Sequence, residues 1–379
     1  MSTSVLLLGG TGAIGDYLRG QLAADGFRVI VTSRQIRAPE PNVHFLVGNA
    51  RDVPFLQNVL KNEKPDAVVD FLTYSTPEFA ARRDILLNGT GHYLFLSSYR
   101  VYADVPCLFE NSPRLLDTIN DPAYLATDEY ALCKARGENL LHEGRSRNWT
   151  ILRPSITYSK NRFQLGCLEA YTFLWRHARK LPSAIPSSML DKETTLTWAG
   201  DTAKMISRLV CNDAALGETF NISTSEHRSW RYVADTYKSA IGLEICDIPL
   251  SEYANATGKA KTYYDRMFNR ILDNSKILAA TGLDGTAFAD LRTMLTREVR
   301  DFVSCGREED STRARRAFVS QNAVLDKFCG TRIRLSNLSL KERFLYLKTL
   351  YPRMNRFLPF RGIRSVKRAL SRSCIWRHQ

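Results

Sequence analysis

Residues 5–15 read VLLLGGTGAIG, and this stretch decides the fold. Its first four residues form a short apolar run of the kind that makes a buried parallel strand. Gly9, Gly12 and Gly15 follow at intervals of three, and residues 17–22 have the pattern of a helix. Glycines at this spacing allow a tight turn, close approach of the backbone to a pyrophosphate, and close packing of helix on strand. A strand before and a helix after favour a dinucleotide site over an ordinary glycine-rich turn.

The residues of this turn are the first candidate binding site. The N-terminus of the helix presents free backbone N–H groups and a positive partial charge, and both stabilise phosphate. We therefore expect the dinucleotide to contact Gly9, Gly12, Ala13, Ile14 and Gly15.

The second strand, residues 28–32, bears on the choice of dinucleotide. NAD-binding proteins usually place a carboxylate at its end, where it accepts from the ribose 2′-hydroxyl. Here the chain continues Thr32-Ser33-Arg34, without a carboxylate. An arginine and two hydroxyls suit a 2′-phosphate, so the sequence favours NADP(H) over NAD(H), with Arg34 as the contact. The alternative is that Arg34 is a solvated surface residue.

The alternation of strand and helix then repeats, which predicts a parallel, doubly wound α/β sheet with ligands at the carboxyl ends of its strands. Asn49 and Ala50, just after the third strand, are expected near the adenine. Ser98 follows the fifth strand and lies at the edge where chemistry is expected, although a serine there also commonly caps a turn. Further strands are expected at residues 43–47, 67–72 and 92–96, with a helix at 78–88.

Tyr130 and Lys134 are the second chemical signal. Residues four apart share one face of a helix, so an ammonium group can lie beside a phenol and a bound cofactor. A phenol titrates near pH ~10, and a nearby cation lowers its pKa, which makes it a better base. Alone, this spacing is weak evidence, because tyrosine and lysine meet by chance on many helices.

Taken in order, these motifs resemble the extended short-chain dehydrogenase/reductase family, which contains nucleotide-sugar epimerases, dehydratases and ketoreductases. The resemblance covers about residues 4–305, and the ordered set is more specific than any of its members. Besides the glycine turn and the Tyr-x-x-x-Lys pair, it includes residues 97–102, Glu110 with Pro113, residues 152–154, 197–203 and 217–222.

The resemblance implies a Rossmann-like fold and roles for three residues. Tyr130 is then the acid/base that exchanges a proton with a substrate hydroxyl, Lys134 lowers its pKa and holds the nicotinamide ribose, and Ser98 orients the hydroxyl. Hydride transfer at a sugar carbon follows, as in an epimerase or a ketoreductase of cell-surface polysaccharide or glycan precursor synthesis. Dehydratases carry an Asp-Glu pair where this chain has Tyr99-Arg100, so dehydration is disfavoured.

Residues 1–306 are expected to form one dinucleotide-binding domain, and its later half is expected to supply a smaller substrate lobe. Asp201 is expected to cap a helix over residues 202–211. His92 and His177 lack a partner at metal-ligand spacing, so no metal site is expected. The lobe is predicted from residues 155–186 and 224–284, and the candidates for holding the base or diphosphate are Arg162, Gln164, Trp198, Tyr263 and Arg266.

The excess positive charge lies in residues 307–379. This basic C-terminal extension has 18 Lys and Arg against 5 Asp and Glu, whereas the whole chain has 53 against 39. A helix over residues 338–351 is predicted, with an apolar face and a basic face, which indicates a membrane surface or an acidic partner. Docking of that helix on the protein's own core is the alternative. The apolar face is expected to contain Leu340, Phe344, Leu347 and Tyr351.

Two other classes of function stay open: a non-catalytic dinucleotide-binding regulator, and an RNA-binding relative of the same fold. The complete Tyr/Lys pair argues against the first. The near-neutral residues 1–306 disfavour RNA and DNA, because nucleic-acid binding needs a basic groove. The first strand begins almost at Met1 and no apolar run approaches ~20 residues, so we expect a cytoplasmic protein, peripheral at the inner face of the membrane if the extension binds lipid. A homodimer is left open.

Overall fold

The computed structural model describes residues 2–306 and 315–351. These residues form two compact units, with the division near residue 310. No helix in the two described ranges is long and apolar enough to cross a membrane.

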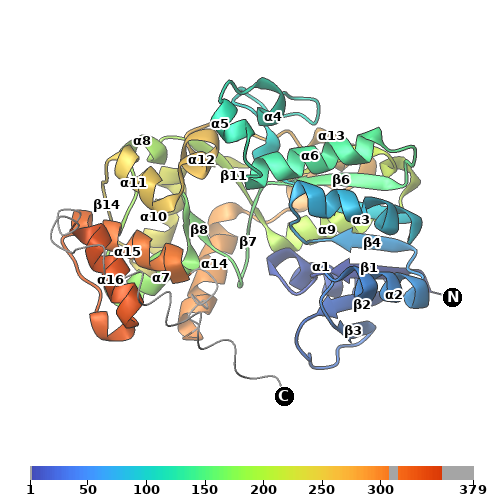
Figure 1. Cartoon of the computed structure of the whole chain (residues 1–379), viewed down its shortest axis with the longest axis horizontal. Helices are drawn as coiled ribbons and strands as arrows, with labels where there is room; N and C mark the ends of the chain where they lie inside the picture. The colour runs from blue at the N-terminus through green and yellow to red at the C-terminus, as the bar shows by residue number, and fades with distance from the viewer. Residues whose placement is uncertain (1, 307–314, 352–379) are drawn as a thin grey trace, which may run out of the picture. The chain divides into compact units, whose positions relative to one another are not determined.

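The first unit is built on a seven-stranded parallel sheet (Figure 1). The strand order is β12-β6-β5-β4-β1-β2-β3, so the chain runs outward from β1 to β3 and then returns to β4 on the other side of β1. The predicted doubly wound fold is confirmed, and the reversal at β1 and β4 creates a crevice at the carboxyl ends of these strands. The strands are β1 (Ser4–Leu8), β2 (Arg28–Ser33), β3 (Val43–Val47), β4 (Ala67–Asp70), β5 (His92–Leu96), β6 (Trp149–Pro154) and β12 (Glu218–Ile222).

Strand β1 shows how the sheet buries both faces. Successive side chains of a strand point to opposite faces. Val5 and Leu7 accordingly belong to the core under α1 and α9, whereas Leu6 and Leu8 belong to the core under α2 and α3. All four residues are fully buried, which explains why the strand reads as a continuous apolar run. The covering helices are α1 (Ala13–Ala24), α9 (Ala199–Leu209) and α13 (Ser275–Thr281) on one face, and α2 (Val53–Glu63), α3 (Thr76–Asn88) and α6 (Tyr130–Glu143) on the other.

A single helix, α3, joins β4 to β5, as the short connection predicts. It begins at Thr76, two residues before the predicted start. The reason is a capping box, in which the Glu78 carboxylate accepts from the backbone N–H of Ser75 at 2.8 Å. This arrangement satisfies N–H groups that the first helical turn leaves without partners.

The segments between β6 and β12, and after β12, form a smaller lobe of the first unit (Figure 1). Its strands are short, and a π-helical turn, η3, occurs at Thr262–Arg266. Such turns are rare and are frequently found at functional sites. The lobe contains β7 (Ile156–Tyr158), β8 (Gln164–Leu165), β9 (Leu168–Glu169), α7 (Ala170–His177), β10 (Ser183–Ala184), α8 (Ser187–Leu190), β11 (Glu193–Trp198), β13 (His227–Ser229), α10 (Trp230–Ile241), β14 (Ile245–Cys246), α11 (Leu250–Thr257) and α12 (Lys259–Lys261), and α14 (Leu291–Ser304) closes the unit.

The capping role predicted for Asp201 is wrong. Helix α9 begins at Ala199, with Trp198 at the N-cap position, so Asp201 lies inside the first turn. Its carboxylate is fully buried and accepts from the backbone N–H of Ala289 at 2.8 Å and from Lys204 at 3.0 Å. Asp201 therefore holds the segment before α14 against α9.

The second unit is a pair of helices, α15 (Arg315–Cys329) and α16 (Leu340–Leu350), with a short turn, η6 (Leu335–Asn337), between them. Buried Asp326 joins the pair, because it accepts from the Tyr346 hydroxyl at 2.6 Å and from the backbone N–H of Ile333 at 2.8 Å. The predicted helix near residue 340 is confirmed.

The buried face of α16 differs from the predicted apolar face. Tyr346 and Leu350 are buried, whereas Leu340 is 81% exposed and Phe344 is 46% exposed. The described part of this helix thus carries exposed apolar side chains.

Candidate active site

The glycine turn has the geometry that a dinucleotide cradle requires. Gly9 has a φ of +74°, which only glycine adopts without strain, and its N–H donates to the Thr32 hydroxyl at 3.1 Å. A Cβ added at Gly15 would lie 2.6 Å from backbone atoms of Gly10, so no side chain fits there. Gly12, at the N-cap of α1, faces open space. The residues present therefore fit a bound pyrophosphate.

Three polar residues lie at the end of β2, and two of them have structural roles. Thr32 is buried, and its hydroxyl fixes the glycine turn. The Ser33 hydroxyl donates to the carbonyl of Gln35 at 2.7 Å and so shapes the following loop. Arg34 is exposed and has no partner among the described residues. Of the three, only Arg34 is free to contact a ligand.

The proposed adenine residues lie just beyond β3. Asn49 is exposed, and its side-chain oxygen accepts from the backbone N–H of Arg51 at 3.2 Å. Ala50 is buried in the core under α2.

Tyr130 and Lys134 lie at the start of α6, which has Glu129 at its N-cap. The Lys134 side chain is buried, with its Nζ 5.9 Å from the centre of the Tyr130 ring. This Nζ donates to the carbonyl of Leu96 at 2.6 Å and to the carbonyl of Leu72 at 3.3 Å. Lys134 thus lies at the carboxyl ends of β5 and β4, and β4 is one of the two strands at which the strand order reverses.

Ser98 and Ser97 have different surroundings although they are neighbours. The Ser98 hydroxyl accepts from the backbone N–H of Arg100 at 3.2 Å, at the start of the short turn η1 (Tyr99–Val101). The Ser97 hydroxyl donates to the fully buried Glu138 at 2.5 Å. Only Ser98 reaches the crevice.

Several other motif residues are structural rather than chemical. Arg153 donates to both carboxylate oxygens of Glu138, at 2.9 and 2.7 Å, and to the Tyr102 hydroxyl at 2.9 Å. Tyr102 in turn donates to the side chain of Asn221 at 2.7 Å, and the Asn221 backbone N–H donates to Glu110 at 2.8 Å. These residues tie β6, β12 and α6 to the segment that follows η1.

One cavity of about 380 Å³ gathers the candidate catalytic residues with the smaller lobe. Ser98, Tyr130 and Lys134 line it together with Ile14 of the glycine turn. Of the five lobe residues predicted to hold a substrate, the cavity is lined by Arg162, Gln164 and Arg266.

The other two predicted lobe residues, Trp198 and Tyr263, do not line this cavity. The indole N–H of Trp198 donates to buried Glu298 of α14 at 2.9 Å, which makes it a packing residue of the first unit. The sequence analysis also missed Glu169 and Lys261, which do line the cavity. Their residue types alone gave no signal, because charged residues at such positions are usually solvated.

The lobe side of the cavity is strongly polar. Glu169 accepts from Lys261 at 2.9 Å and from Gln164 at 2.6 Å. Burial alone raises the pKa of the Glu169 carboxyl, but Lys261 and Arg162 outweigh it and hold that pKa below its ordinary value. Arg162 is exposed and has no side-chain partner among the described residues, so it is free to meet an anion.

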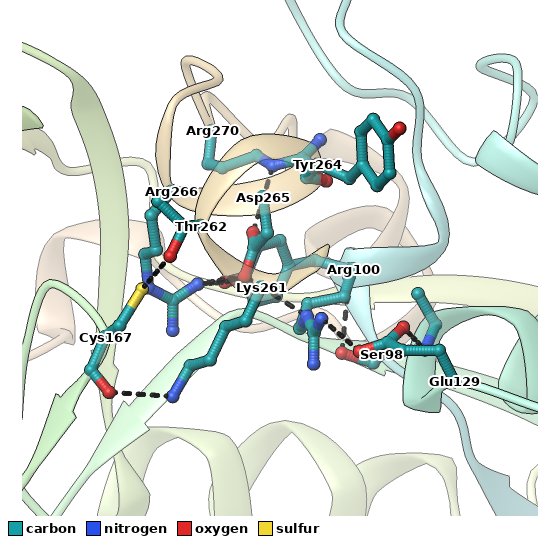
Figure 2. Close-up of polar contacts among 12 residues, drawn as sticks. Ser98, Arg100, Glu129, Cys167, Lys261, Thr262, Tyr264, Asp265, Arg266 and Arg270 are labelled. Carbon is teal, nitrogen blue, oxygen red and sulfur yellow. Dashed lines mark hydrogen bonds and ion pairs between the residues drawn. The ribbon is translucent and has the colours of Figure 1, made fainter. Parts of the chain in front are cut away.

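A cluster of buried charges adjoins the cavity at the π-helical turn. Figure 2 shows Arg100, Arg266 and Arg270 converging on Asp265. Burial alone raises the pKa of the Asp265 carboxyl, but Arg266, Arg100 and Arg270 together lower it below its ordinary value. The carboxylate is therefore ionised, and its charge is compensated inside the protein.

His92, one of the two histidines excluded as metal ligands, has a structural role. Its ring nitrogen shares a hydrogen bond of 2.7 Å with the Thr150 hydroxyl. Burial lowers the pKa of His92 to about 4. No group of three or more potential metal ligands occurs in the two described ranges.

The parallel sheet, the glycine turn and the crevice define the class of this protein: an NAD(P)-dependent enzyme of the short-chain dehydrogenase/reductase type. The model of the NAD dependent epimerase/dehydratase family matches residues 5–223, and the chain belongs to that family.

One curated relative matches a short part of the chain. A UDP-glucose 4-epimerase of Lacticaseibacillus casei is 37% identical over 76 residues, which are 19% of this chain and 23% of that protein. The chain thus matches about a quarter of the length of this curated relative.

Solved structures share the fold over most of the chain at low sequence identity. The Thermus thermophilus UDP-glucose 4-epimerase complex with NAD has a TM-score of 0.58 at 19% identity, and the match covers 79% of this chain and 99% of that one. WbmH of Bordetella bronchiseptica, solved with NAD+, has a TM-score of 0.59 at 16% identity, with coverage of 81% and 100%. Epimerase Mth375 of Methanothermobacter thermautotrophicus has a TM-score of 0.61 at 17% identity, with coverage of 80% and 93%.

Proposed function

We propose that this protein is a nucleotide-sugar epimerase or ketoreductase in which Tyr130 exchanges a proton with a hydroxyl on the reacting sugar carbon. The observation that carries this proposal is the single cavity in which Ser98, Tyr130 and Lys134 meet beside Ile14 of the glycine turn. A similar fold, that of MoeE5, has been solved with UDP-glucuronic acid and NAD, which supports a nucleotide sugar as substrate. Synthesis of cell-surface polysaccharide or glycan precursors is the proposed setting.

The hydrogen-bonding capacity of the three residues supports their roles. The bound dinucleotide supplies the hydride chemistry. Lys134 has three N–H donors and uses two on backbone carbonyls, which leaves one for a ribose hydroxyl. The Ser98 oxygen accepts from a backbone N–H, which leaves its own proton to orient the substrate oxygen. Tyr130 then takes the hydroxyl proton as hydride leaves the same carbon, and returns it in the reverse step.

Replacement of Tyr130 tests this assignment. Tyr130→Phe keeps the ring and removes the proton carrier, so we expect a loss of turnover of about 10²–10⁴-fold with dinucleotide affinity retained. Turnover is measured with nucleotide sugars and with keto-sugars plus NADPH. Unchanged turnover in Tyr130→Phe would overturn the proposal.

Analysis of the purified, denatured protein separates the two proposed reactions. Stoichiometric dinucleotide in the extract supports an epimerase that returns the hydride to the same molecule. An empty protein that reduces a keto-sugar with NADPH supports a ketoreductase. An empty protein that turns over neither substrate contradicts both.

We propose that NADP(H) is preferred, because exposed Arg34 directly follows β2, where a carboxylate is usual. Binding titrations of both dinucleotides to the protein and to Arg34→Glu test this. The expected result is that the variant loses affinity for NADP(H) and keeps it for NAD(H). Equal effects on both dinucleotides would contradict the preference.

We also propose that the second unit contacts an anionic membrane surface. Leu340 and Phe344 are exposed apolar side chains on α16, and Lys341 and Lys348 on the same helix are exposed as well. Apolar insertion together with basic residues is how interfacial helices bind lipid. Such contact would keep the enzyme near membrane-bound glycan assembly.

A further inference from the structure

The ring of Tyr130 lies near two cations from different parts of the fold. The Lys134 Nζ lies 5.9 Å from the ring centre, and the Arg100 guanidinium carbon lies 5.2 Å from it. Arg100 also lines the cavity, and its backbone N–H donates to the Ser98 hydroxyl. Arg100 therefore contacts both candidate catalytic residues, the Tyr130 ring through its guanidinium and the Ser98 hydroxyl through its backbone N–H.

Two carboxylates pair with the Arg100 guanidinium, Glu129 through a hydrogen bond and Asp265 through an ion pair without hydrogen-bond geometry. One of its terminal nitrogens donates to Glu129 at 2.7 Å, and its Nε pairs with Asp265 at 3.2 Å. The hydrogen bond to Glu129 orients the planar guanidinium, and the charge of Asp265 attracts its other edge. Figure 2 shows Arg100 between these two partners.

Glu129 connects this ion pair to the backbone of the catalytic helix. It directly precedes Tyr130, and its carboxylate accepts from the backbone N–H of Ala131 at 2.8 Å and from the Tyr124 hydroxyl at 3.0 Å. Arg100 thus reaches Tyr130 twice, through the ring and through the residue that caps its helix.

Asp265 connects the same ion pair to the substrate lobe. Asp265 is 1% exposed and lies in the π-helical turn, next to Arg266. Arg266 lines the cavity, as does Lys261 one turn earlier. Asp265, which pairs with Arg100, therefore belongs to the same short segment as two residues that line the cavity.

We infer that Arg100 and Asp265 are positioning residues, which hold the Tyr130 ring in its reactive orientation and link that orientation to the substrate lobe. The inference rests on the proposed function and adds to it the residues that place the acid/base. Nothing in the glycine turn or the Tyr-x-x-x-Lys pair requires this link, since Arg100 and Asp265 are far apart in sequence.

Turnover in a pair of variants and their combination tests the link. We expect Arg100→Met and Asp265→Asn each to lower kcat by about 100-fold, the scale of a small misplacement of a reacting group, with dinucleotide affinity unchanged. Because both changes break one link, the double variant is expected to be no worse than the poorer single one. Additive losses would overturn the inference.

Arg114→Met is the matched control. Arg114 also pairs with a carboxylate of α6, Glu138, at 3.1 Å, and its side chain is 17% exposed against 13% for Arg100. It lies outside the cavity lining, so we expect a lower melting temperature and an unchanged kcat. An equal loss of kcat in this control would show that the effect is general destabilisation and would overturn the inference.

A second measurement does not depend on activity. With 3-fluorotyrosine incorporated at position 130 of the full chain, we expect one ¹⁹F resonance in the parent protein, a shifted or broadened one in Arg100→Met and Asp265→Asn, and no change in Arg114→Met. A protein with no turnover but this ¹⁹F response would contradict the proposed function and support the positioning role. An active protein whose ¹⁹F signal ignores both substitutions would overturn the positioning role alone.

Discussion

Two adjacent serines, Ser97 and Ser98, have different surroundings and therefore different expected roles. Ser97 points into the buried network around Glu138, and Ser98 points into the crevice. Both serines lie between β5 and η1, and Ser98 has an extended backbone, in which successive side chains point to opposite sides.

Substituting each serine by alanine separates chemistry from stability. Ser98→Ala removes a hydrogen bond to a reacting oxygen, worth about 1.5–3 kcal/mol, so we expect kcat to fall roughly 10- to 100-fold, with a loss of stability no larger than the one hydrogen bond from the Arg100 N–H, about 1 kcal/mol. Ser97→Ala is the matched control and is expected to lower the unfolding free energy while kcat is kept. The reverse pattern would show that the roles are exchanged.

Glu138 gives a pH dependence of stability. Burial alone raises the pKa of its carboxyl, but Arg153, Ser97 and Arg114 outweigh it, so the pKa in the folded state is lowered. A lowered folded-state pKa stabilises the fold above the unfolded-state pKa of about 4.3, and this contribution is lost as the pH falls through the folded-state value.

Denaturant unfolding of Glu138→Gln at several pH values checks this. At neutral pH the variant leaves Arg153 buried without its carboxylate, and we expect it to be less stable by about 3–5 kcal/mol. Below pH ~4 the difference is expected to shrink, because Glu138 becomes protonated in the parent protein. A difference that stays constant with pH would contradict the ion-pair account.

At the scale of elements, the strands of the main sheet could be predicted closely from sequence. The strands at residues 43–47 and 92–96 have the predicted bounds, because both read as short, mainly apolar runs, although only the second is buried. The lobe strands β8, β9, β10 and β14 have two residues each, too few to give a pattern.

The candidate site was predictable only where its residues are close in sequence. Ser98, Tyr130 and Lys134 belong to local motifs, and one cavity brings them together. The pairing of Arg100 with Asp265 joins segments 165 positions apart, and the buried role of Asp201 depends on Ala289. Such contacts follow from the packing of the lobe, which no local pattern encodes.

Two glycines of α1 provide a matched test of the cradle. A Cβ at Gly15 would lie 2.6 Å from the backbone of Gly10, so Gly15→Ala is expected to abolish dinucleotide binding. Gly20 is in the same helix with nothing within 4 Å of such a Cβ, so Gly20→Ala is expected to bind normally and to be up to about 1 kcal/mol more stable. Isothermal titration and thermal melting measure both. Normal binding by Gly15→Ala would contradict the cradle.

At the scale of the whole molecule, the excess positive charge and the candidate catalytic residues lie in different parts of the sequence. Residues 307–379 hold 18 basic residues against 5 acidic ones, whereas the 35 and 34 of the remaining chain nearly cancel. The proposed reaction in the first unit does not need this excess of positive charge. We therefore propose a separate partner, an anionic membrane surface, for the second unit.

Vesicle co-sedimentation of the full chain tests the membrane proposal. Leu340→Ser with Phe344→Ser removes the exposed apolar side chains of α16, so we expect weaker binding to phosphatidylserine vesicles and unchanged turnover. Phe109→Ser is the matched control, because Phe109 is 46% exposed, as Phe344 is, but lies in the first unit. Equal binding by all three proteins would remove the proposed role of α16.

The most direct test of the central claim is a structure of the protein with saturating dinucleotide. The expected result is a pyrophosphate on the glycine turn, a ribose hydroxyl on the Lys134 ammonium, and a nicotinamide ring facing the Tyr130 hydroxyl across the cavity. A glycine turn that stays empty, or a nicotinamide ring bound away from Tyr130, would contradict it.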